Sequence, residues 1–332
     1  MASDAARLPD LPHPVSRALR ERARSGSEPG AREDPHRIAL VIEGGGMRGV
    51  VSAGMTAALE RLGLTPCFDL VVGASAGAFN GAALIGGVAG HGAATYSGPL
   101  ASRAFVNPAR VLRGRPVIDV TYALNYTSAD IDAGRHERVL NSPIELHCIA
   151  VDVDTACPVS LSGMRTKGEL WNALLASSRT PWAGGPPIEI GGRRYIDGGL
   201  GAAIPVKEAL AAGASHVLVL QTRPQGVPRK GVSRLADRLI ERQLRRLNPA
   251  LLTLYRDRLD WYERVVADIG ERSRDPGGDK PPVLGLRPPA GTPVVGQLER
   301  RSAVLATAAR DAERLVEGVL RPAAAPQPLR AG

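Results

Sequence analysis

Short apolar runs of strand length alternate along the chain with segments in which hydrophobic residues recur at helical spacing. Ile38–Glu43 is an apolar run that ends in glycines, and the following segment, Val50–Leu62, has helical spacing. Phe68–Val72 and Ala78–Ile85 repeat this order of strand, tight turn and helix. Strands that alternate with helices are typical of a mainly parallel sheet covered on both faces. The pattern therefore predicts an α/β fold, a three-layer sandwich with helices on both faces of a central sheet.

The later part of the chain continues this alternation. Further strands are expected at residues 144–151, 158–161, 188–190, 193–196, 216–220 and 283–286. Further helices are expected at residues 117–124, 132–140, 167–177 and 205–212, with a last helix from about 295 to 320. Gly191 and Gly192 separate two of these strands and predict a tight hairpin.

One folded unit with an appendage at each end is the expected domain organisation. Residues 1–36 are rich in Arg, Pro, Ser and Gly without a sustained period, which predicts a flexible N-terminal arm with room for a short helix. Residues 37–321 form the α/β domain, in which the interrupted segment 98–142 is a candidate cap over a site. Residues 232–272 are helical in pattern and heavily charged. The bias of residues 322–332 toward Ala and Pro predicts a disordered tail.

Composition and charge narrow the range of partners. Hydrophobic residues make up 44% of the chain and charged residues 23%, as in ordinary globular proteins, so a sizeable core can be buried. The net charge of +9 favours contact with anionic surfaces. Aromatic residues are only 4%, and no run interleaves basic and aromatic side chains as single-strand binding requires. We therefore expect no nucleic-acid partner and at most a peripheral contact with an anionic membrane.

The cysteines and the apolar runs bear on the cellular compartment. Cys67, Cys148 and Cys157 form neither a metal-ligand quartet nor an even disulfide framework. The N-terminal segment lacks the basic-then-apolar pattern of a signal peptide, and no run approaches 18 apolar residues. These features predict a cytoplasmic protein that holds no metal and no cofactor.

The sharpest chemical motif is Gly73-Ala74-Ser75-Ala76-Gly77, which lies between an expected strand and an expected helix. It matches the nucleophile elbow G-x-S-x-G in the structural context that the elbow requires. A sharp turn of this kind exposes the Ser75 hydroxyl, and side chains at Gly73 or Gly77 would collide with the neighbouring strand and helix. Taken alone, the same letters are also compatible with an ordinary glycine-rich turn.

A second glycine-rich segment, Gly44-Gly45-Gly46-Met47-Arg48-Gly49, also follows a strand and precedes a helix. Backbone N–H groups in such a loop converge where negative charge can sit. One interpretation is a phosphate cradle, but Asp69 stands near the start of the next strand, where a ribose-binding acid would be misplaced. The other is an oxyanion hole, in which these N–H groups and that of Ala76 face the carbonyl oxygen that Ser75 attacks.

The third motif is Asp197-Gly198-Gly199, directly after the hairpin strand that ends at Ile196. An acid at a strand end followed by two glycines can approach another loop closely. Asp-Gly is also a common turn, so this motif has little specificity by itself.

Together, Gly-Gly-Gly-x-Arg-Gly, Gly-x-Ser-x-Gly and Asp-Gly-Gly in this order resemble the motifs of the patatin-like phospholipase family. The similarity runs from about Ile38 to Arg223, and Val283–Pro288 with the helix behind it resembles the closing elements of that family. The resemblance implies a patatin-like domain over residues 37–321 that hydrolyses lipid acyl esters, with phospholipase A or lysophospholipase-like activity.

The resemblance also implies a role for each motif residue. Ser75 corresponds to the nucleophile and Asp197 to its direct general base, a Ser-Asp dyad that works through an acyl-enzyme. The oxyanion loop comprises Gly44, Gly45, Gly46 and Arg48, with Ala76 as a further donor. The supporting glycines of the motifs are Gly49, Gly73, Gly77, Gly198 and Gly199. The implied partner is a lipid or another acyl-ester substrate.

Two alternatives remain open from the residues. An α/β-hydrolase triad would use Ser75, Asp197 and His216, which stand in the chain order of such enzymes. His216 begins an apparent buried strand, however, whereas a catalytic histidine belongs on a loop beyond a strand's carboxyl end. The other alternative is a binding module without turnover, in which the glycine loop of residues 44–49 holds a phosphate group or a lipid.

Overall fold

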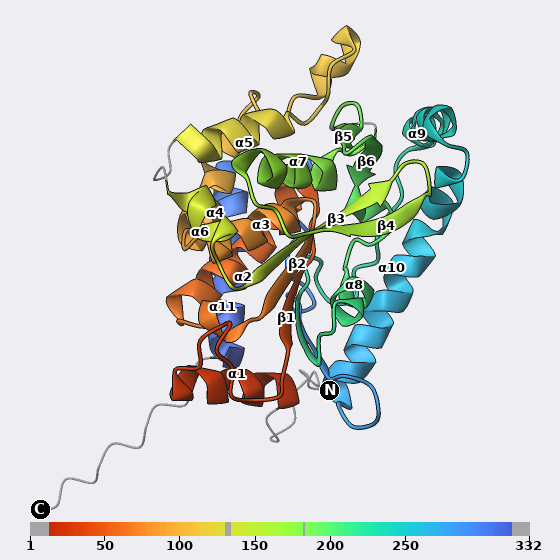
Figure 1. Cartoon of the computed structure of the whole chain (residues 1–332). Coiled ribbons are helices and arrows are strands. Elements are labelled where there is room, and N and C mark those ends of the chain that lie inside the picture. The colour runs from red at the N-terminus through yellow and green to blue at the C-terminus, as the bar shows by residue number, and fades with distance from the viewer. Residues whose placement is uncertain (1–12, 130–133, 182, 321–332) are drawn as a thin grey trace, which may run out of the picture.

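A central sheet with helices on both faces makes up the body of the protein (Figure 1). The computed structural model describes residues 13–129, 134–181 and 183–320. Its strands are β1 (Ile38–Ile42), β2 (Leu70–Ala74), β3 (Glu145–Asp152), β4 (Cys157–Leu161), β5 (Ile188–Ile190), β6 (Arg193–Asp197), β7 (His216–Leu220) and β8 (Val283–Leu286). Its α-helices are α1 (Pro14–Ser25), α2 (Val50–Arg61), α3 (Ala76–Ile85), α4 (Ala89–Ser97), α5 (Val120–Ala129), α6 (Arg135–Leu140), α7 (Lys167–Ser178), α8 (Val206–Ala211), α9 (Arg234–Leu247), α10 (Leu251–Arg274) and α11 (Ser302–Leu320).

The sheet has the order β5-β6-β3-β2-β1-β7-β8, and β4 pairs with β3 outside this path. The strands β3, β2, β1, β7 and β8 are parallel, whereas β4, β5 and β6 are antiparallel to their neighbours. The predicted α/β fold with a mainly parallel sheet is confirmed. From β1 the chain proceeds outward through β2 to β3 and later returns to the other side of β1 with β7. In open α/β sheets, ligands bind at the carboxyl ends of the strands where the order reverses in this way.

Alternate residues of β1, β2, β7 and β8 enter two separate cores, as the two-residue period of a strand requires. Leu40 and Ile42 of β1 pack with α2, α4 and α11 on one face. Ala39 and Val41 pack on the other face, with α8 and α10. Figure 1 shows the sheet between these two helical layers. The strands are therefore buried on both faces, and their carboxyl ends are left open for a site.

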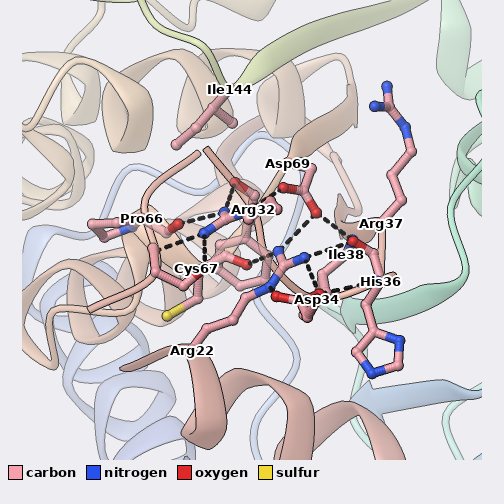
Figure 2. Close-up of polar contacts among 12 residues, drawn as sticks. Arg22, Arg32, Asp34, His36, Arg37, Ile38, Pro66, Cys67, Asp69 and Ile144 are labelled. Carbon is pink, nitrogen blue, oxygen red and sulfur yellow. Dashed lines mark hydrogen bonds and ion pairs between the residues drawn. The ribbon is translucent and has the colours of Figure 1, made fainter. Parts of the chain in front are cut away.

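The N-terminal segment differs from the flexible arm expected for residues 1–36. Residues 13–36 include α1, whose Val15 and Leu19 are buried in the core, whereas residues 1–12 lie outside the described part of the chain. The guanidinium of Arg22 is 2% exposed and donates to both carboxylate oxygens of Asp34, to Asp69, and to the carbonyls of His36 and Cys67 (Figure 2). These bonds fasten α1 to the amino end of the strands. The sequence lacks the long hydrophobic period that would predict this docking, because the face of α1 that packs on the protein includes a buried arginine.

Two further differences concern helix boundaries and the tail. The last helix begins at Ser302 rather than near Val295. The backbone N–H groups of Arg300 and Arg301 donate to the Glu299 side chain, and these residues lie just before the helix. The preceding loop instead delivers the Gln297 carbonyl to the N–H of Met47 at 3.0 Å. The predicted tail, residues 322–332, lies outside the described residues.

Candidate active site

Ser75 lies on a sharp turn between β2 and α3, at the carboxyl end of the central strands. Its backbone has φ 56° and ψ −127°, a conformation that non-glycine residues rarely adopt and that is typical of functional sites. Gly77 makes this turn possible, because a Cβ there would collide with the Ile42 carbonyl oxygen of β1. A Cβ at Gly73 would meet the backbone of Gly77 in the same way. The elbow thus holds the Ser75 hydroxyl above the sheet edge.

Asp197 is the last residue of β6, and its carboxylate faces the elbow. The Ser75 hydroxyl donates to Asp197 Oδ2 at 3.1 Å, although the two residues are 122 positions apart in the sequence. The N–H of Gly199 donates to Asp197 Oδ1 at 2.7 Å, and Gly198 packs so closely on Ile149 of β3 that a Cβ would meet its carbonyl oxygen. The side chain is buried, and this burial raises the pKa of Asp197, while its hydrogen bonds act in the opposite direction.

Two hydroxyl residues, one in the last turn of helix α7 and one just after it, support this pair, and the sequence motifs did not identify them. Thr180 donates to Asp197 Oδ2 at 2.8 Å, to the same oxygen that accepts the Ser75 hydroxyl. Ser177 accepts the N–H of Ser75 at 2.9 Å and donates to the Ile149 carbonyl at 2.7 Å. The only signal in the sequence is the polar run Ser177-Ser178-Arg179-Thr180 at the end of an otherwise apolar helix.

The glycine loop of residues 44–46 follows β1 and lies against the elbow. A Cβ at Gly44 would meet the Ala74 carbonyl, and one at Gly49 would meet the Cβ of Ala76, so both positions lie directly beside the Ser75 turn. Gly45 has φ 142° and Gly46 has φ 59°, values that favour glycine. The N–H groups of Met47 and Arg48 are already bound to carbonyls. The loop donors that remain as candidates for a ligand are therefore the glycine amides, together with Ala76, which opens α3.

Arg48 is buried behind this loop rather than exposed on it. Its Nε donates to the Thr222 hydroxyl at 3.0 Å, and its Nη2 lies 3.9 Å from Oε1 of buried Glu43. Burial lowers the pKa of Arg48 to about 10, so the side chain is still charged at neutral pH. A Cβ at Gly45 would touch the guanidinium, which places the positive charge directly against the loop.

A pocket opens at these residues, and its wall changes in character from one side to the other. Helices α3 to α7 contribute a mainly apolar wall that includes Phe79, Val120, Leu124, Val139 and Leu174. His136 and Trp171 also line it. The segment that follows β7 contributes Arg223, Arg229 and Lys230, and helix α10 contributes Arg258. Ser75 and Asp197 lie on the wall between these groups. Part of the segment 98–142, expected as a cap, thus forms the apolar wall of the pocket.

His216 is not brought to the site. It pairs with Ile38 at the amino end of β1, whereas Gly73, just before Ser75, pairs with Ile42 at the carboxyl end. Four strand residues, roughly 13 Å, separate these levels. His216 contacts the ring of His36 instead, with centroids 4.3 Å apart. The geometry contradicts a triad of Ser75, Asp197 and His216.

Comparison with known proteins identifies the family of the chain. The sequence matches the family model described as patatin-like phospholipase over residues 40–210, more than half of the 332-residue chain. The chain therefore belongs to the patatin-like phospholipase family, and the resemblance noted from the motifs is confirmed.

Two curated relatives and one solved structure show how far this similarity extends. The chain is 34% identical over 192 residues to the uncharacterized protein YjjU of Escherichia coli (strain K12), which covers 57% of this chain and 53% of that protein. It is 33% identical over 188 residues to the lysophospholipase NTE1 of Yarrowia lipolytica, which covers 55% of this chain and 12% of that protein. The chain thus matches about half of the first relative and a small part of the second. The crystal structure of VipD from Legionella pneumophila aligns with a TM-score of 0.43 at 13% identity, over 86% of this chain and 67% of that one.

The helices of the described part of the chain also bear on membrane insertion. None of those within residues 13–129, 134–181 and 183–320 has the length and apolar character needed to cross a bilayer.

Proposed function

We propose that this chain is a lipid acyl-ester hydrolase in which Ser75 is the nucleophile and Asp197 its direct general base. The observation that supports this most strongly is the 3.1 Å hydrogen bond from Ser75 Oγ to Asp197 Oδ2, at a strained elbow that opens into a pocket. A serine hydroxyl needs a base in hydrogen-bonding reach before it can attack a carbonyl carbon. Asp197 fulfils this requirement without an intervening histidine.

The reaction follows from this geometry in two halves. Asp197 takes the hydroxyl proton as Ser75 Oγ bonds to the carbonyl carbon of the ester, and the protonated acid then passes that proton to the departing alcohol as the C–O bond breaks. The acyl group is now esterified to Ser75. Asp197 next deprotonates a water molecule, which attacks the acyl carbon, and the Ser75 oxygen leaves with the proton held by Asp197. The products are a fatty acid and the free enzyme.

The oxyanion of each tetrahedral intermediate would be bound by the main chain. The candidate donors are the N–H groups of the 44–46 loop and of Ala76, with the positive charge of Arg48 behind the loop. Removal of one such donor typically lowers turnover by about 100- to 1000-fold. The substrate is a lipid ester in this proposal because the apolar wall of helices α3 to α7 fits an acyl chain, and because the chain belongs to the patatin-like phospholipase family.

Labelling with a serine-directed fluorophosphonate tests the proposal. Wild-type protein should be labelled at Ser75 and should hydrolyse p-nitrophenyl acyl esters, whereas Ser75→Ala should do neither. His216→Ala is the matched control and should hydrolyse the esters within about twofold of the wild-type rate, because this side chain lies at the other end of the strands. An unlabelled wild-type protein would favour the binding module without turnover. Loss of activity in His216→Ala alone would instead restore the triad.

A further inference from the structure

Glu43, at the end of β1, is surrounded by more positive charge than it can neutralise. Its carboxylate accepts the Tyr262 hydroxyl at 3.0 Å and the backbone N–H of Thr222 at 2.6 Å. Arg48 lies 3.9 Å away as its ion-pair partner. The guanidinium carbons of Arg223 and Arg229 stand 6.0 and 5.4 Å from the centroid of the Tyr262 ring, whose hydroxyl binds this carboxylate. Three guanidinium groups thus gather around Glu43 and Tyr262, and their charges act on one another.

Arg223 forms no ion pair with any carboxylate in the described part of the chain. The residue is 8% exposed, and its Nε is buried without a hydrogen-bond partner. Within the described residues, no hydrogen bond or ion pair engages its guanidinium. Its carbonyl, by contrast, accepts the Nε of Arg287 at 2.8 Å, so the backbone is held in place. A buried charge without a partner is unfavourable unless a ligand of opposite charge completes the site.

Arg229 connects the arginine cluster to the loop that holds Asp197. Its Nη2 donates to the Gly199 carbonyl at 3.3 Å, and the N–H of the same Gly199 holds Asp197. Its backbone N–H is bound by Glu263, which fixes the loop. Burial, and the nearby charge of Arg223, lower the pKa of Arg229. Arg258 differs from both, because it already has Asp237 at 3.7 Å.

The two sides of the pocket thus suit the two ends of one amphiphile. Apolar side chains of helices α3 to α7 line one part of the pocket, and another part carries Arg223 and Arg229, which form no ion pair with a carboxylate among the described residues. Guanidinium forks match the geometry of phosphate oxygens and bind them through paired charge-assisted hydrogen bonds. A phosphate group there would reduce the mutual repulsion of Arg223 and Arg229.

We propose that Arg223 and Arg229 form an anion subsite that binds the phosphate group of an acyl-ester substrate, so that the enzyme prefers phosphate-bearing lysolipids to neutral esters. This inference rests on the proposed function of Ser75 and Asp197. It adds the residues that would select, among lipid esters, those whose alcohol portion carries a phosphate.

The test compares short-chain, monomeric 1-acyl lysophosphatidate with 1-monoacylglycerol of the same chain. We expect the ratio of their kcat/KM values to fall at least tenfold in Arg223→Gln, mainly through a higher KM for the lysophosphatidate. A similar fall is expected in Arg229→Gln. The matched control is Arg256→Gln, on the exposed side of α10, where the side chain pairs with Glu241 and the ratio should not change. Arg223→Gln should melt at or above the wild-type temperature, because it removes an unpartnered buried charge.

A binding measurement separates this inference from the proposed function. Calorimetry on Ser75→Ala, which cannot turn over, should show lysophosphatidate binding at least tenfold tighter than monoacylglycerol, and the Ser75→Ala/Arg223→Gln double variant should lose this preference. An equal affinity for both lipids in Ser75→Ala would overturn the subsite even if the wild type is active. Inorganic phosphate is the second probe. If it binds in an Arg223-dependent way while the lipid preference is absent, the site belongs to free phosphate and the headgroup proposal is wrong.

Discussion

The two ends of the parallel strands each bury arginines, but in opposite electrostatic circumstances. At the amino end, Arg22 makes five hydrogen bonds, and Asp34 and Asp69 neutralise it (Figure 2). At the carboxyl end, Arg223 is buried without a hydrogen bond to its Nε. The first arrangement satisfies a charge within the fold and so stabilises it. The second leaves charge unsatisfied, which is useful only if a ligand completes it.

The carboxylates of the two ends show the same contrast. The bidentate bond from Arg22 lowers the pKa of Asp34 to about 2, so this group favours its charged form. Burial raises the pKa of Asp197, so the fold disfavours the charged form that a general base requires. The charged groups at the amino end of the sheet thus stabilise the fold. At the carboxyl end, the ionisation of buried Asp197 lowers the stability of the fold.

The largest effect on activity is expected for Asp197→Asn. Ester hydrolysis should fall about 10³-fold, because the amide cannot accept the Ser75 proton. The melting temperature should nevertheless rise by a few degrees at pH 8, since the folded-state pKa of Asp197 lies above its unfolded value and its ionisation therefore opposes folding. Activity assays and calorimetry on the same samples measure both effects.

The pH dependence of this gain provides the control. As pH falls below the folded-state pKa, wild-type Asp197 becomes neutral, so the difference in melting temperature should shrink toward pH 4. An Asp197→Asn protein that melts below wild type at every pH would show that the carboxylate stabilises the fold, contrary to the comparison.

The next largest effect concerns the amino end. Arg22→Met should lower the free energy of unfolding by about 2–3 kcal/mol, because two carboxylates and two carbonyls lose their shared donor. The depressed pKa of Asp34 gives stability that is present above pH 4 and lost as pH falls toward 2, and the variant should lose this dependence. Urea unfolding between pH 2 and 7 measures both.

Arg24→Met serves as the matched control on the same helix. Arg24 is exposed, so its removal should change the free energy of unfolding by less than about 0.5 kcal/mol. Both variants should keep the wild-type kcat, because α1 docks at the end of the strands remote from Ser75. Equal destabilisation by the two substitutions would mean that the helix, rather than the buried charge cluster, carries the effect.

Features that depend on local backbone geometry could be predicted from the sequence. The glycines at 73 and 77 indicate the elbow because only glycine fits there, and the alternation of strands and helices indicates the sheet. The pairing of Ser75 with Asp197 could be expected only because three motifs together resemble a family. Nothing local specifies that residues 122 positions apart share a hydrogen bond.

Side chains that act through tertiary contacts were missed for the same reason. Nothing in the sequence distinguishes Arg22 from Arg223. Packing gives Arg22 hydrogen-bond partners and leaves the buried Nε of Arg223 without one. Thr180 carries no motif, although it shares an oxygen of Asp197 with Ser75. The last helix starts later than its pattern predicts because the preceding residues make tertiary contacts instead, such as the bond from the Met47 N–H to the Gln297 carbonyl.

The smallest effect is expected for Thr180→Val, which tests whether a hydrogen bond to Asp197 offsets the effect of burial on its pKa. This change removes one hydrogen bond to a carboxylate, so kcat/KM should fall roughly tenfold. The Thr180 bond lowers the pKa of Asp197 against the effect of burial, so its loss should shift the acid limb of the pH–rate profile to higher pH. Thr180→Ser, which keeps the hydroxyl, should restore both the rate and the limb. A fall in rate with an unmoved acid limb would mean that Thr180 positions the carboxylate without lowering its pKa, and that this bond does not offset the effect of burial. An unchanged rate would mean that Thr180 only fills space.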